Sequence, residues 1–156
     1  MMHVVVIGGV AAGMSAAAKL KRNLKEEVDI EVFEKGQEVS YGACGLPFYV
    51  SGKIRDASTL VERTVEQFAE SGITVRLGHE VTAVDTAKKT VAVRERAKDE
   101  TFIRSSDKLI VASGARVRRI PHLDVQREHL HAMRTVAAGV RLSKQLDDPH
   151  VKDVVV

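Results

Sequence analysis

Cys44 is the only cysteine of the chain, and it lies between Gly42 and Gly45 in the run S-Y-G-A-C-G-L-P-F-Y-V over 40–50. A single thiol closes no disulfide within its own chain, so its oxidised form is a mixed disulfide with a small thiol, a sulfenic acid or a persulfide. A short helix is expected over 44–50, and the partial positive charge at a helix start stabilises a thiolate. These features favour a reactive sulfur, and the alternative is a buried, inert cysteine.

A glycine-rich turn near the N-terminus predicts a nucleotide site. An apolar strand ends at Gly8 and a helix starts close to Gly13, the layout in which free helix N–H groups bind a pyrophosphate. The strict fingerprint has a middle glycine where this chain has Val10, and we expect Gly9 to supply the missing room. Glu34 stands 21 positions after Gly13, where an acid accepts hydrogen bonds from ribose hydroxyls. The alternative is a glycine-rich turn without a ligand.

The elements around these two sites predict an α/β fold. The first strand, the helix after it and the second strand form a β-α-β unit, and its right-handed crossover makes the two strands parallel. Two segments of alternating polarity around a polar turn predict an antiparallel hairpin, followed by a third strand. We expect strands over 3–7, 28–33, 73–77, 80–84, 90–94, 101–104, 108–112 and 151–156, and helices over 11–22, 44–50, 64–70 (with a capping box) and 135–146.

The composition predicts one globular domain and excludes several kinds of function. The chain has 156 residues, of which 44% are hydrophobic and 29% charged, with a formal net charge of +3. Aromatic residues make up 4% and tryptophan is absent, so little is available to stack nucleic-acid bases. No run approaches the ~20 apolar residues of a membrane span. A single cysteine predicts a reducing cytoplasm, and the six histidines lack the spacing of metal ligands.

Three stretches resemble the N-terminal flavin domain of the pyridine nucleotide-disulfide oxidoreductases. They are the glycine turn with the strand end at 33–35, the run at 40–47, and L-I-V-A-S-G-A at 109–115. Within that family the chain is most similar to the single-cysteine branch, which includes coenzyme A-disulfide reductases, NADH oxidases and peroxidases, and coenzyme A persulfide reductases. The resemblance implies a Rossmann-like, three-layer FAD-binding fold with a parallel sheet and an additional β-meander.

The same resemblance implies roles for individual residues. Cys44 is the catalytic sulfur placed against the flavin. The two-cysteine branch places its partner cysteine five positions away, where this chain has Val39 and Tyr49, so a dithiol mechanism is excluded. Arg22 and Ser40 match positions that contact coenzyme A, and a plain cation at a helix C-terminus is an equal alternative for Arg22. The implied FAD-binding residues are Gly8, Gly9, Ala12, Gly13, Glu34, Lys35, Val81, Ala112, Ser113 and Gly114.

The reaction implied by the resemblance is the reduction of a coenzyme A disulfide, a persulfide or a similar small disulfide by NAD(P)H, through FAD and Cys44. Two alternatives stay open. In the first, the protein is an NADH oxidase or peroxidase whose acceptor is oxygen or peroxide and whose cysteine cycles through a sulfenic acid. In the second, it is a nucleotide-binding module without redox turnover.

The resemblance also predicts the domain limits. Residues 1–150 correspond to the N-terminal portion of an FAD-binding domain, and 151–156 to the first strand of a missing NAD(P)H-binding domain. The chain ends on the bare apolar run V-V-V, which favours its being the N-terminal piece of a longer protein. We expect a homodimer for the complete protein, and weak FAD binding without turnover for this piece alone.

Overall fold

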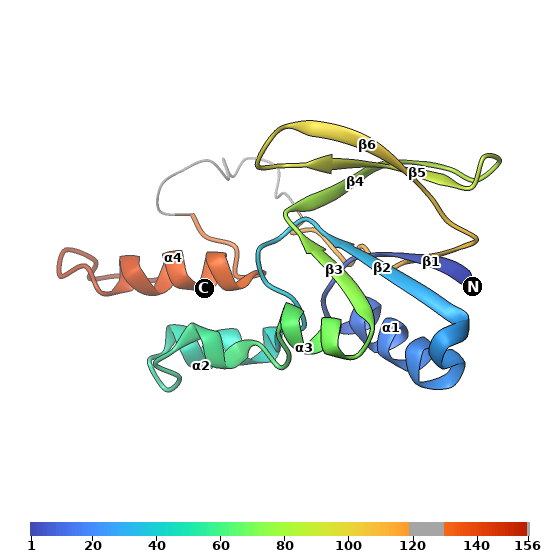
Figure 1. Ribbon diagram of the computed structural model, residues 1–156. Coiled ribbons are helices and arrows are strands. Elements are labelled where there is room, and N and C mark those ends of the chain that lie inside the picture. The colour runs from blue at the N-terminus through green and yellow to red at the C-terminus, as the bar shows by residue number, and fades with distance from the viewer. Residues whose placement is uncertain (119–129, 156) are drawn as a thin grey trace. The chain divides into compact units, whose positions relative to one another are not determined.

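The computed structural model describes residues 1–118 and 130–155, and the chain forms two compact units (Figure 1). The first unit, here called the sheet unit, comprises Met1–Tyr41 and Arg63–Gly114. The second, here called the helical unit, comprises Gly42–Glu62 and the described part of Ala115–Val156. Every strand of the described residues belongs to the sheet unit.

A parallel sheet with the strand order β3-β2-β1-β7 forms the centre of the sheet unit. Its strands are β1 (Met2–Ile7), β2 (Val28–Glu34), β3 (Ile73–Leu77) and β7 (Lys108–Val111). Side chains on both faces of β1 are buried, which explains why its residues 4–7 are a continuous run of β-branched residues. β2 instead alternates over 28–32, with buried Val28, Ile30 and Val32 separated by acidic residues. The parallel pairing expected from the β-α-β unit is confirmed.

Two helices, α1 (Ala11–Leu24) and α3 (Val65–Glu70), cover one face of the parallel sheet (Figure 1). The predicted capping box is present at the start of α3. The Thr64 side chain accepts a hydrogen bond from the Gln67 N–H, and the Gln67 side chain accepts one from the Thr64 N–H at 2.9 Å. The core on this face is made by Val4, Val6, Met14, Ala17, Val28, Ile30, Val32, Val39, Phe68, Ile73 and Val75.

An antiparallel meander covers the other face of the parallel sheet (Figure 1). Its strands are β4 (His79–Asp85), β5 (Thr90–Glu95) and β6 (Glu100–Ser105), with an irregularity in the β4–β5 register between Val81 and Ala83. Val91 and Val93 of β5 pack against Val5 and Phe33 of the parallel sheet. Helices, parallel sheet and meander are the three layers expected for a Rossmann-like fold of this class.

The helical unit contains α2 (Leu46–Val50) and α4 (Val136–Leu146), together with 3-10 helices over Ala43–Gly45 and Ala57–Leu60. Gly139 brings α4 close to α2, because a Cβ there would lie 3.0 Å from Cδ2 of Leu46. None of the helices in the described part of the chain is long and apolar enough to cross a membrane.

The strand expected over 151–156 is not formed in residues 151–155, and residue 156 lies outside the described residues. The Val151 N–H donates instead to the Asp148 carbonyl oxygen at 3.0 Å, which is a turn contact. An apolar segment becomes a strand only when a neighbouring strand supplies hydrogen-bond partners, and these residues have no such neighbour in the described part of the chain. The domain limit at residue 151 therefore stays a prediction.

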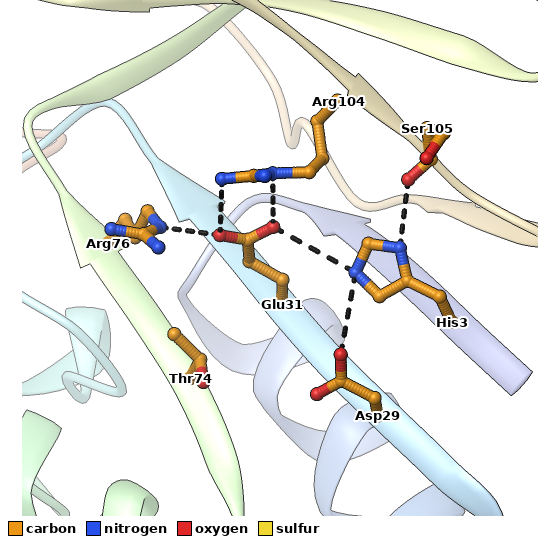
Figure 2. A pocket seen from close by; sticks show the side chains of 7 residues that line it. All are labelled: His3, Asp29, Glu31, Thr74, Arg76, Arg104 and Ser105. Atoms are coloured by element: carbon orange, nitrogen blue, oxygen red, sulfur yellow. Dashed lines mark hydrogen bonds and ion pairs between the residues drawn. The ribbon is translucent and has the colours of Figure 1, made fainter. Parts of the chain in front are cut away.

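A charged cluster joins the two sheets of this unit (Figure 2). Glu31 of β2 is 6% exposed, and its carboxylate lies between Arg76 of β3 and Arg104 of β6. Its Oε1 lies 2.5 Å from Arg76 Nε, and its Oε2 lies 2.8 Å from Arg104 Nε. His3 of β1 donates from Nδ1 to the Ser105 carbonyl oxygen at 2.8 Å. Its Nε2 lies 3.8 Å from Glu31 Oε2, so Glu31 contacts three strands, one of them in the opposite sheet.

Candidate functional site

The glycine turn lies at the carboxyl end of β1, the edge at which parallel sheets bind ligands. Gly8 has a φ of +105°, and its N–H donates to the Phe33 carbonyl oxygen at 2.9 Å. A Cβ at Gly8 would overlap the Ala112 carbonyl oxygen, and a Cβ at Gly13 would overlap the Gly8 carbonyl oxygen. Both glycines are therefore required for the close approach of β1, α1 and the segment after β7.

The first turn of α1 offers free backbone N–H groups at this turn. Its N-cap is Val10, whose side chain accepts no hydrogen bond, and the first turn carries no acidic residue. Val10 has a φ of −104°, so the backbone here does not need the glycine of the strict motif. No described residue accepts from the N–H groups of Ala11, Ala12 or Gly13. Free donors and a positive helix end fit a pyrophosphate.

Glu34 closes the turn from the end of β2. Its Oε2 accepts from the Gly9 N–H and its Oε1 from the Gly36 N–H, both at 2.7 Å. A carboxylate has about four acceptor positions, so two remain for the hydroxyls of a ribose. Lys35 beside it is exposed. With the free N–H groups of α1, these residues fit the ADP half of FAD.

The segment after β7 reaches the same turn. The Ala112 N–H donates to the Ile7 carbonyl oxygen at 2.8 Å, which extends the β1–β7 pairing by one residue. Ser113 is exposed and Gly114 has a φ of +69°. Ala112 and Ser113, both expected to bind FAD, thus lie beside Gly8, since a Cβ at Gly8 would meet backbone atoms of both. Val81 lies elsewhere, on β4, where it packs against the apolar cluster between the sheets.

Of the two residues expected to contact coenzyme A, only Ser40 lies at the glycine turn. Its N–H donates to the Gly9 carbonyl oxygen at 2.8 Å, and its φ of +49° is a left-handed value that is uncommon outside glycine. Such backbone strain is typical of functional positions. Arg22 is exposed in the last turn of α1, about 14 Å along the helix axis from Gly13, so the structure does not bring it to this turn.

Cys44 belongs to the helical unit and is exposed, so it is not the buried cysteine of the alternative interpretation. It lies in the 3-10 helix Ala43–Gly45, directly before α2. The Gly42 N–H donates to the Leu60 carbonyl oxygen at 2.7 Å, and a Cβ at Gly45 would lie 2.5 Å from Cδ2 of Leu60. The two flanking glycines thus hold this turn against Leu60 and leave the thiol accessible. Because α2 has only five residues, few peptide dipoles add up along it, and the partial positive charge at its N-terminus is small.

The loop next to Glu34 includes contacts that the sequence did not indicate. The Gly78 N–H donates to the Gly36 carbonyl oxygen at 2.9 Å, and Arg96 donates from Nη1 to the Lys35 carbonyl oxygen at 3.2 Å. Arg96 is 61 positions away from Lys35 in the chain. No local pattern connects the two, because the meander brings them together only after folding.

A Gly9→Ala substitution tests whether the Glu34 carboxylate belongs to the nucleotide site. An added Cβ would lie 2.8 Å from Cβ of Glu34 and 3.2 Å from its Cγ, so the acidic side chain must move away from the Gly9 N–H. In the complete protein we expect the affinity for FAD to fall about tenfold, the size of one lost hydrogen bond to a charged group. A fluorescence titration with FAD measures this. An unchanged dissociation constant would mean that Glu34 does not bind the cofactor.

Comparison with known proteins gives a family match over almost the whole chain. The sequence model of a family described as pyridine nucleotide-disulphide oxidoreductase matches residues 2–156. A protein named coenzyme A disulfide reductase from Staphylococcus aureus (strain bovine RF122 / ET3-1) is 38% identical over 116 residues, which are 74% of this chain and 26% of that protein.

Two solved structures share the fold. The reduced CoADR-RHD of Bacillus anthracis superposes with a TM-score of 0.88 at 32% identity, covering 94% of this chain and 27% of that one. The NAD-dependent persulfide reductase of A. fulgidus has a TM-score of 0.88 at 31% identity, covering 95% and 28%. The chain therefore spans about a quarter to a third of the length of the proteins it matches.

Proposed function

Because the chain belongs to the pyridine nucleotide-disulphide oxidoreductase family, we propose that the complete protein is an FAD-dependent enzyme that uses NAD(P)H to reduce a small disulfide at Cys44. Coenzyme A disulfide is the proposed substrate, with a coenzyme A persulfide as the nearest variant. The observation that carries the proposal is a single, exposed cysteine in a chain whose glycine turn fits a dinucleotide. Cytoplasmic location and a homodimer are part of the same proposal.

The residues proposed to hold FAD act in distinct ways. The N–H groups of Ala12 and Gly13 bind the pyrophosphate, and Glu34 binds the ribose hydroxyls through its two remaining acceptor positions. The backbone of Val81 is proposed to meet the adenine, and the segment 112–114 the flavin end of the cofactor. When bound, FAD supplies the two-electron relay between NAD(P)H and the cysteine.

Cys44 performs the sulfur chemistry in this proposal. Its thiolate attacks one sulfur of the disulfide, the S–S bond breaks, and one coenzyme A thiol leaves and takes up a proton. Cys44 is then a mixed disulfide with the second coenzyme A. Two electrons from NAD(P)H and one further proton release that thiol and restore the Cys44 thiolate. Arg22 and Ser40 are proposed to contact the coenzyme A part of the substrate, Arg22 through a phosphate.

An assay of the products tests the proposal against the two alternatives. The purified complete protein is mixed with NADH or NADPH and coenzyme A disulfide, and free thiol, peroxide and oxygen uptake are measured. We expect two thiols for each nucleotide oxidised, with little oxygen consumed. Oxygen uptake or peroxide loss without thiol release would instead make the protein an oxidase or peroxidase. A colourless complete protein that binds no flavin would be a non-redox nucleotide-binding module.

A further inference from the structure

A chain of hydrogen bonds runs from the end of β5 to the Glu34 carboxylate. Arg96 directly follows β5, and its backbone N–H donates to the Gly78 carbonyl oxygen at 2.9 Å. The Gly78 N–H in turn donates to the Gly36 carbonyl oxygen at 2.9 Å. The Arg96 side chain reaches the same loop, because its Nη1 donates to the Lys35 carbonyl oxygen at 3.2 Å. Arg96 is thus fixed by its backbone beside the loop that its guanidinium binds.

The Lys35–Gly36 peptide group connects Arg96 with Glu34. Its carbonyl oxygen accepts from the Arg96 guanidinium, and its N–H donates to Glu34 Oε1 at 2.7 Å. Hydrogen bonds at the two ends of one peptide group polarise and strengthen each other. Arg96 therefore fixes the orientation of the donor that holds one oxygen of the carboxylate.

The other oxygen of Glu34 is held by the glycine turn. Its Oε2 accepts from the Gly9 N–H at 2.7 Å. The position of this N–H is fixed because the Gly8 backbone before it packs tightly against the Ala112 backbone. The carboxylate thus has one anchor in the β1–α1 turn and one in the 35–36 peptide group. A loose second anchor would let the carboxylate rotate away from the positions that face a ribose.

We infer that Arg96 is a positioning residue for the ADP half of FAD, acting on Glu34 through the 35–36 peptide group. This inference rests on the proposed function, since it takes FAD as the bound nucleotide. Arg96 itself is exposed, and its hydrogen bonds to Lys35 and Gly78 both end on backbone oxygens. Its role is therefore to hold the loop in its binding conformation rather than to bind substrate.

The test compares Arg96→Met with Arg94→Met in the complete protein after removal of its flavin. Arg94 is the matched control: it lies two residues earlier on β5, is exposed, and pairs with Asp99 at 2.6 Å instead of with the loop. We expect the dissociation constants of FAD and of ADP to rise about 3- to 10-fold for Arg96→Met, and to stay within twofold of wild type for Arg94→Met. Arg96→Lys, which keeps a cationic donor, should recover part of the affinity.

The outcomes separate the inference from the proposed function. Wild-type affinity for ADP in Arg96→Met would overturn the inference and leave the function intact. Equal losses in Arg94→Met would overturn it as well, because a general charge effect would explain them. A lower unfolding midpoint of the flavin-free Arg96→Met protein without rescue by lysine would show a purely structural role. A wild-type protein that binds no FAD would refute the proposed function and, with it, the inference.

Discussion

The Cys44→Ser variant of the complete protein is expected to lose disulfide reduction while keeping its flavin. A serine hydroxyl is not ionised at neutral pH and forms no mixed disulfide, so the covalent step has no nucleophile. We expect the rate of coenzyme A disulfide reduction to fall on the order of 10³-fold or more, as for the loss of other enzymatic nucleophiles. Thiol release under excess NAD(P)H measures the rate, and the visible absorption of FAD measures cofactor content.

Two matched variants make this prediction specific. Cys44→Ala has neither a thiol nor a hydroxyl, and it should behave like Cys44→Ser because both variants lack the sulfur. Ser51→Ala alters a similar exposed side chain in the same unit, one that donates to the Phe48 carbonyl oxygen at 3.1 Å, and should keep the wild-type rate. If Cys44→Ser reduces coenzyme A disulfide at the normal rate, the single-cysteine mechanism is wrong.

The Glu31→Ala variant is expected to be strongly destabilised. The substitution leaves the two guanidinium groups of Arg76 and Arg104 facing each other without their shared carboxylate (Figure 2). Removing one partner of a buried ion pair costs about 3–5 kcal/mol. The Arg76 and Arg104 side chains are 42% and 38% exposed, so water solvates part of the freed charge and we expect the lower end of that range.

Urea denaturation checks this prediction, with Asp29→Asn as the control. Asp29 lies on the same strand and its carboxylate is 3.8 Å from the same His3 ring, but its side chain is 51% exposed. An exposed pair contributes about 0–1 kcal/mol, so Asp29→Asn should barely move the midpoint. If the urea midpoint shifts by a similar amount in both variants, at an unchanged denaturant slope, Glu31 does not stabilise the packing of the two sheets.

The chain's local patterns predicted most of the elements and the glycine turn. Gly8, Gly13 and Glu34 all belong to one β-α-β unit, so a short stretch of sequence is enough to indicate how they meet. The capping box at Thr64 likewise depends on a spacing of three residues, and the structure confirms it. The glycine turn and the capping box can be predicted from the sequence because the residues that form them are close together in the chain.

Only the tertiary structure decided which distant residues meet. Glu31 lies on β2 between buried Ile30 and Val32, and its partners Arg76 and Arg104 come from 45 and 73 positions further along the chain. In the same way, Arg96 follows a strand of the meander and donates a hydrogen bond to Lys35, which follows a strand of the parallel sheet. The segment 151–155 shows the converse, since its apolar residues predict a strand but pair with none of the strands in the described part of the chain. Periodicity along a chain specifies which face of an element is buried, whereas the partner on that face depends on how the sheets are stacked.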